Sequence, residues 1–110
     1  MYKISFTDYF EDELDEAHEY LLAKSDSETI VEKYFKAFYE KLVSIKEMAY
    51  IWSLVDDDVL ANKGFRSFLV KNYLVFYKVI EDEETVYIHR FLHSSRDWAN
   101  ILKEDLEDEN

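Results

Sequence analysis

Six side chains in the second half of the chain have the types needed to bind or process an anion. They are five basic residues and one histidine: Arg66, Lys71, Lys78, Arg90, His93 and Arg96. Guanidinium groups bind phosphates and carboxylates through paired hydrogen bonds. An imidazole with an ordinary pKa of about 6.5 can act as a general acid or base near neutral pH. We therefore expect any chemistry on an anionic partner to take place between residues 63 and 103.

Arg90 lies in a segment, residues 85–92, that is expected to be a strand. In a strictly alternating strand its side chain shares a face with three apolar residues, Val86, Ile88 and Leu92. His89 then points with Tyr87 and Phe91 to the other face. A charge on an apolar face needs a partner, because burying a lone charge is costly. Two interpretations remain open: a structural ion pair, for instance with Asp97, or a cleft at the sheet edge that awaits a phosphate or an acidic partner.

His93 and Arg96 lie just beyond that strand. His93 precedes Ser94 and Ser95, so it is either a loop residue with an acid–base role or an ordinary surface side chain. Arg96 opens the last expected helix, where a positive charge opposes the helix dipole. A basic residue placed against its local preference is typical of a binding role.

Several kinds of site are excluded by what the sequence lacks. The chain has no cysteine, which rules out disulfides and thiolate chemistry, and its one glycine cannot form a glycine-rich phosphate loop. The three histidines, His18, His89 and His93, have no metal-ligand spacing. The acidic runs 11–13 and 56–58 are typical of solvated surface. We predict neither a metal nor a cofactor.

The charge of the 110 residues is strongly negative and unevenly distributed. The net charge of −12 comes from 25 acidic and 13 basic residues, and residues 1–62 alone carry 15 acidic against 6 basic side chains. This balance argues against direct sequence-specific DNA binding, because phosphate contacts need clustered lysine and arginine. No signal peptide or apolar run long enough for a membrane span is found, so we expect one cytoplasmic domain over residues 1–110.

The elements that position the candidate residues follow from a change in hydrophobic periodicity. Residues 2–6 alternate as a strand, and two amphipathic helices follow, with starts indicated by residues 7–11 and 25–28. From Gly64 the period falls to two, over the strand-length runs 65–70, 73–80 and 85–92. A short helix is expected from about Ser95, with a frayed acidic tail over 104–110. The predicted class is α+β, with an antiparallel helix pair packed on one face of an antiparallel meander.

Two of these segments carry a family resemblance. The run GFRSFLVKNYLVFYKV at residues 64–79 resembles the central strands of RelE/ParE superfamily toxins. The run TVYIHRFLHSSRDW at residues 85–98 is similar to the last strand and following turn of that superfamily. The resemblance implies a growth-inhibiting toxin of a type II toxin–antitoxin, or plasmid stabilisation, module with a cognate antitoxin as partner. It covers about the last two fifths of the chain.

The resemblance leaves three functions open. A ParE-like toxin binds a protein target such as DNA gyrase without being an enzyme, and this is the function we expect. A RelE-like toxin cleaves messenger RNA on the ribosome; in that alternative Arg66, Arg90, His93 and Arg96 are the catalytic candidates. Leu74 stands where RelE-like nucleases usually carry an arginine, which weakens that alternative. The third possibility is a non-toxic relative of the same fold.

The acidic first half also has two interpretations. Antitoxins of this superfamily often carry basic DNA-binding regions, which an acidic helix pair would attract. Alternatively, the charge only keeps the chain soluble.

Overall fold

The computed structural model describes residues 1–25 and 27–108 of the chain. Four strands form one sheet in the order β1-β4-β3-β2, in which β1 runs parallel to β4 and the other neighbours are antiparallel. The strands are β1 (Lys3–Phe6), β2 (Arg66–Val70), β3 (Tyr73–Ile80) and β4 (Thr85–His93). The predicted α+β class and the three-strand meander are therefore confirmed, and the short first strand joins the meander at the edge beside β4.

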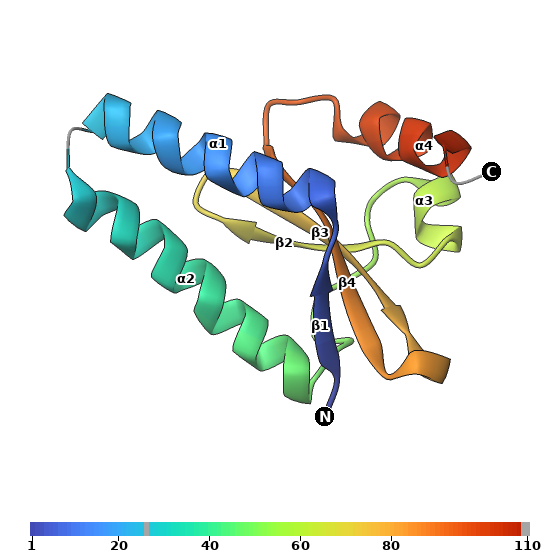
Figure 1. Cartoon of the computed structure of the whole chain (residues 1–110). Helices are drawn as coiled ribbons and strands as arrows, with labels where there is room; N and C mark the ends of the chain where they lie inside the picture. Colours follow the sequence, from blue (N-terminus) through green and yellow to red (C-terminus); the bar gives the residue numbers. More distant parts are fainter. Residues whose placement is uncertain (26, 109–110) are drawn as a thin grey trace.

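The helices lie on both sides of this sheet (Figure 1). They are α1 (Asp8–Ser25), α2 (Glu28–Glu47), α3 (Asp58–Asn62) and α4 (Trp98–Asp108), with a short 3₁₀ turn, η1 (Glu81–Glu83), between β3 and β4. Thr7 caps α1 by accepting the Phe10 N–H, and Ser27 caps α2 by accepting the Ile30 N–H. Helices α1 and α2 form the expected antiparallel hairpin, visible as the blue and green pair in Figure 1. None of the helices among the described residues is long and apolar enough to cross a membrane.

Two hydrophobic cores cover the two faces of the sheet. The first core joins the helix hairpin to one face, and Phe10, Phe38, Val75 and Ile88 are fully buried within it. The second core joins α3 and α4 to the opposite face through Leu60, Phe76, Leu92 and Leu102. Only the first core was expected, because α3 was not predicted and its five residues are too short for a helical period to stand out.

A β-bulge in β4 corrects the predicted facing of Arg90. The register pairs Phe76 with Arg90 but Tyr77 with Ile88, so His89 is an extra residue on β4 at this point of the register. Beyond the bulge the alternation is inverted: Phe91 joins the first core and Arg90 turns to the opposite face. Arg90 therefore shares its face with Leu92 but not with Val86 and Ile88, contrary to the strict alternation.

The C-terminal segment also differs from expectation. Helix α4 begins at Trp98 rather than near Ser95 and continues to Asp108. The acidic residues 104–108 are thus helical and not frayed, and Asp105 is only 6% exposed. The prediction of a frayed tail also included residues 109–110, which lie outside the described residues.

Candidate functional site

Arg90 is held at the centre of an ion-pair cluster that links β4 to both α1 and α4. Its Nε and Nη2 donate to Asp105 Oδ2 and Oδ1 at 2.9 and 2.8 Å, and its Nη1 donates to Glu13 Oε2 at 2.9 Å. The guanidinium also lies 4.0 Å from the centre of the Tyr9 ring, a cation–π contact. The predicted structural ion pair thus exists, but Glu13 and Asp105 are the partners instead of Asp97.

Glu13 has a second role at the edge of the sheet. Strand β1 ends at Phe6, opposite Ile88, so it does not cover the rest of β4. The Glu13 carboxylate accepts the Phe91 backbone N–H at 3.2 Å, while the Thr7 hydroxyl donates to the His89 carbonyl at 2.7 Å. Burial nevertheless raises the pKa of Glu13, because its desolvation outweighs the stabilising bonds from Phe91 and Arg90. This end of α1 therefore completes the hydrogen bonding of an otherwise open strand edge.

Arg66 lies on the edge strand β2, two strands away from Arg90, and fixes the segment between α2 and α3. Its Nη1 donates to the Trp52 carbonyl at 2.7 Å, and its guanidinium lies 4.9 Å from the centre of the Tyr50 ring. The same segment is held by the Tyr77 hydroxyl, which donates to the Ala49 carbonyl at 3.2 Å. Burial raises the pKa of Tyr77. Arg66 thus serves the positioning of residues 48–55, a segment for which the sequence predicted no element.

His93 and Arg96 are the two candidates that lie together. Both are exposed, and both line a small cavity of about 190 Å³ with Glu13, Tyr73 and other residues of α1 and β4. The His93 Nδ1 lies 2.7 Å from the Ser95 hydroxyl and accepts the Ser95 backbone N–H at 3.2 Å. This contact orients the imidazole and leaves Nε2 as its donor in the neutral form.

The four catalytic candidates of the endoribonuclease alternative, Arg66, Arg90, His93 and Arg96, do not all lie in one pocket. Arg66 pairs with Tyr77 while His93 pairs with Tyr73, so the two candidates stand four positions apart along β3, about 13 Å. Arg90 is enclosed by its carboxylate partners, whereas His93 and Arg96 line the same cavity. Among the described residues no three His, Asp or Glu side chains are grouped as a metal site.

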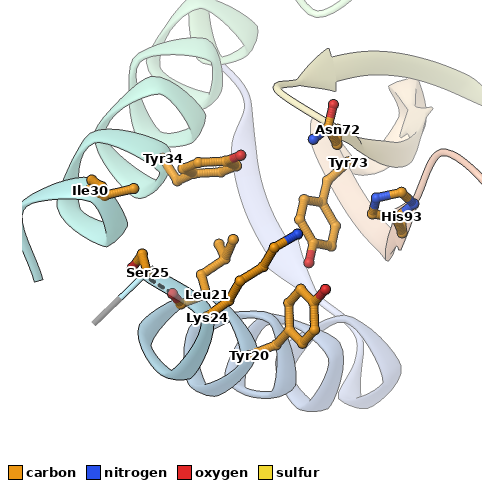
Figure 2. Close-up of a pocket in the computed structure, with 9 residues that line it drawn as sticks. All are labelled: Tyr20, Leu21, Lys24, Ser25, Ile30, Tyr34, Asn72, Tyr73 and His93. Atoms are coloured by element: carbon orange, nitrogen blue, oxygen red, sulfur yellow. Dashed lines mark hydrogen bonds between the residues drawn. The ribbon is translucent and has the colours of Figure 1, made fainter. Parts of the chain in front are cut away.

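A larger cavity, which the sequence did not indicate, adjoins this one. It measures about 310 Å³ and lies between the connected end of the α1–α2 hairpin, the start of β3 and the end of β4 (Figure 2). Its lining residues come from three parts of the chain: Tyr20, Leu21, Lys24, Ser25, Ile30, Tyr34, Asn72, Tyr73 and His93. Burial, and then the neighbouring Tyr20 and Tyr34, raise the pKa of Tyr73. The i, i+4 spacing of Tyr20 and Lys24 was visible in the sequence, but what faces them depends on the fold.

The chain is similar to known toxins in sequence and in fold. The sequence model of the family described as the ParE toxin of the type II toxin–antitoxin system parDE matches residues 4–98. No protein of curated function matches the chain in sequence.

Three solved structures share the fold at low sequence identity. The chromosomal ParDE system from P. aeruginosa superposes with a TM-score of 0.66 at 15% identity, covering 84% of this chain and 96% of that one. The intact E. coli RelBE toxin–antitoxin complex gives 0.57 at 17% identity, covering 87% and 100%. The isolated E. coli RelE toxin gives 0.58 at 16% identity, covering 94% and 98%. With the family match over residues 4–98, the chain belongs to the ParE toxin family of type II toxin–antitoxin systems, within the RelE/ParE superfamily.

Proposed function

We infer that this chain is a ParE-like toxin that inhibits growth in the cytoplasm by binding a protein target such as DNA gyrase, and that a cognate antitoxin neutralises it. The observation that carries this proposal is that the Arg90 guanidinium is occupied by hydrogen bonds within the protein. Each of its three guanidinium nitrogens donates to a carboxylate oxygen of Asp105 or Glu13. An arginine so occupied is a structural residue, because a substrate phosphate would have to displace two carboxylates from it.

The other cations support the same conclusion. Catalysis on a phosphodiester without a metal needs several cations around the phosphate that develops charge in the transition state. Arg66 is bound to the Trp52 carbonyl at a distance from His93, and position 74 holds a leucine that packs against the second core. A net charge of −12 also opposes docking on ribosomal RNA. Binding to a protein target requires none of these groups.

An antitoxin partner is consistent with the surface of the helix hairpin. Helix α1 exposes six carboxylates, those of Asp8, Glu11, Asp12, Asp15, Glu16 and Glu19. Such a surface attracts a basic segment electrostatically and accelerates association. The solved relatives include a ParDE system and a RelBE complex, which supports pairing of this chain with an antitoxin of its own.

The proposal is tested by inducing the chain from a repressed promoter and following growth, transcripts and DNA topology together. We expect growth arrest with intact transcripts, and inhibition of supercoiling by purified gyrase when the purified chain is added. Co-expression of the product of the adjacent open reading frame should restore growth. The variants His93→Ala and Arg96→Ala, both at exposed positions, should remain toxic. Growth arrest with active gyrase would contradict the gyrase target.

A ribosome-dependent endoribonuclease is the second candidate, because His93 and Arg96 line one cavity. In that case primer extension should reveal codon-phased cuts that disappear in both alanine variants. Arg90→Ala is not an informative variant for this purpose, since it also leaves Glu13 and Asp105 without their cation. Absence of any growth arrest would instead indicate a non-toxic relative of the fold.

A further inference from the structure

The lining of the 310 Å³ cavity of Figure 2 contrasts with the acidic composition of the whole chain. The chain carries 25 acidic residues, yet none of the described residues that line this cavity is an aspartate or a glutamate. Its polar groups are instead donors: the Lys24 ammonium, the Asn72 amide, the imidazole of His93 and three tyrosine hydroxyls. In Figure 2 the Lys24 ammonium and the hydroxyls of Tyr20 and Tyr73 converge in the middle of the cavity.

These donors are held ready for an acceptor. Tyr73 is only 8% exposed, its ring stacks on Phe91 with centroids 4.7 Å apart, and burial raises the pKa of its hydroxyl. His93 uses Nδ1 to accept from Ser95, which leaves Nε2 to donate. An anionic group would therefore find a positive charge and several hydrogen-bond donors in one place.

The cavity also offers aromatic surface beside these donors. Tyr20 is 55% exposed, and Tyr34 reaches the cavity from α2, on the opposite side from Tyr20 (Figure 2). Tyrosine rings are stacking surfaces for nucleobases, with little preference for the base. A volume of about 310 Å³ lies at the lower end of the range for small-molecule sites, which fits a single nucleotide.

We propose that this cavity binds a nucleoside monophosphate, with the phosphate at Lys24 and His93 and the base against the tyrosine rings. A single nucleotide is favoured over a nucleic-acid strand, because the net charge of −12 repels a polyanion along its whole length. The proposal is independent of the toxin's target, since it concerns a ligand of the purified protein.

The test is a titration of the ¹⁵N-labelled protein with AMP and with UMP, followed by NMR. We expect the amide signals of Lys24, Asn72 and His93 to shift up to a nucleotide concentration of about 10 mM, enough to saturate a site with a Kd of roughly 1 mM. Inorganic phosphate and uridine, tested separately, should each bind at least about tenfold more weakly, because each has only half of the recognised chemistry.

Matched variants separate the two halves of the site. Lys24→Gln and Tyr20→Ala should each weaken AMP binding about tenfold. Lys33→Gln and Tyr39→Ala change exposed residues of α2 outside the cavity and should leave binding unaltered. The spectra of all four variants report whether each is folded. Absence of shifts at the cavity, equal binding of phosphate alone, or equal affinities in the Lys24→Gln and Lys33→Gln variants would each overturn the proposal.

Discussion

Arg90 and Asp105 are joined by two parallel hydrogen bonds, from Nε to Oδ2 at 2.9 Å and from Nη2 to Oδ1 at 2.8 Å. This side-on geometry matches the guanidinium to the carboxylate and fixes the orientation of both groups. Asp105 is 6% exposed and lies on α4, so the pair attaches the C-terminal helix to the last strand of the sheet. Arg90, which the sequence offers as a possible phosphate ligand, is thus a structural residue that joins β4 to α4.

Replacing Asp105 should destabilise the protein strongly. Asp105→Ala leaves the Arg90 guanidinium partly buried with Glu13 as its remaining ion-pair partner, and breaking such a pair costs about 3 kcal/mol. Urea denaturation followed by circular dichroism gives the free energy of unfolding. The matched control is Glu104→Gln, one position earlier on the exposed side of α4, which should change it by less than about 0.5 kcal/mol. Equal midpoints for the two variants would refute this role of Asp105.

Replacing Glu13 by glutamine should have a much smaller effect at neutral pH. The glutamine oxygen can still accept the Phe91 N–H, and the burial that raises the pKa of Glu13 no longer acts against a charge. We expect a change in unfolding free energy within about 1 kcal/mol at pH 7. Because the pKa in the folded state lies above its ordinary value of 4.5, the wild type should lose stability relative to Glu13→Gln as the pH rises through the folded pKa. If the difference in unfolding free energy between the wild type and Glu13→Gln stayed constant from about pH 4 to about pH 8, the raised pKa of Glu13 would be contradicted.

The hydrogen bond to Glu81 should shift the titration of the Tyr2 hydroxyl to higher pH. The Tyr2 and Tyr50 hydroxyls both donate to the Glu81 carboxylate, and this hydrogen bond raises the pKa of Tyr2 to about 12. A tyrosine with a raised pKa stabilises the fold fully below its unfolded pKa of 10.0, and that stability is lost as the pH rises through about 12. NMR of ¹³Cζ-labelled tyrosine measures the titration directly. In Glu81→Gln the pKa of Tyr2 should return toward 10, whereas Asp82→Asn, in the same 3₁₀ turn, should leave it unchanged.

Gly64 should tolerate substitution only at a conformational cost. Its φ is +91°, and a Cβ atom added there would meet nothing within 4 Å. The penalty for Gly64→Ala therefore comes from the backbone alone and should be about 1 kcal/mol. Gly64→Asn should be less destabilising, because asparagine enters the left-handed region more readily than alanine. Thermal denaturation of the two variants measures this order, and a more stable alanine variant would contradict it.

Much of the fold could be predicted because its signals are local. The run of alternating apolar residues over 73–80 matches β3 (Tyr73–Ile80), and the two amphipathic stripes match α1 and α2. The start of the second helix was also near its true position, although Ser27 is the cap and Ser25 ends α1. These features depend on neighbours within one or two turns.

What could not be predicted depends on contacts between distant segments. Arg90 has two carboxylate partners: Glu13 lies 77 positions before it and Asp105 lies 15 positions after it. No spacing rule in the sequence connects residues this far apart. Asp105 belongs to an acidic run that favours a solvated tail, although Leu102 and Leu106 continue the helical period. The cavity beside Lys24 arises only where the hairpin meets the ends of the central strands.

The extra residue at His89 inverts which face of the sheet each later residue of β4 points to. Before His89, the even-numbered residues of β4 face the helix hairpin, whereas after it the odd-numbered residues do. Residues of β4 pack into both hydrophobic cores. If the same residues alternated strictly, without this bulge, Arg90 would face the apolar first core and Phe91 would face the opposite side of the sheet. Homologues of this chain are therefore comparable position by position only when this irregularity is aligned first.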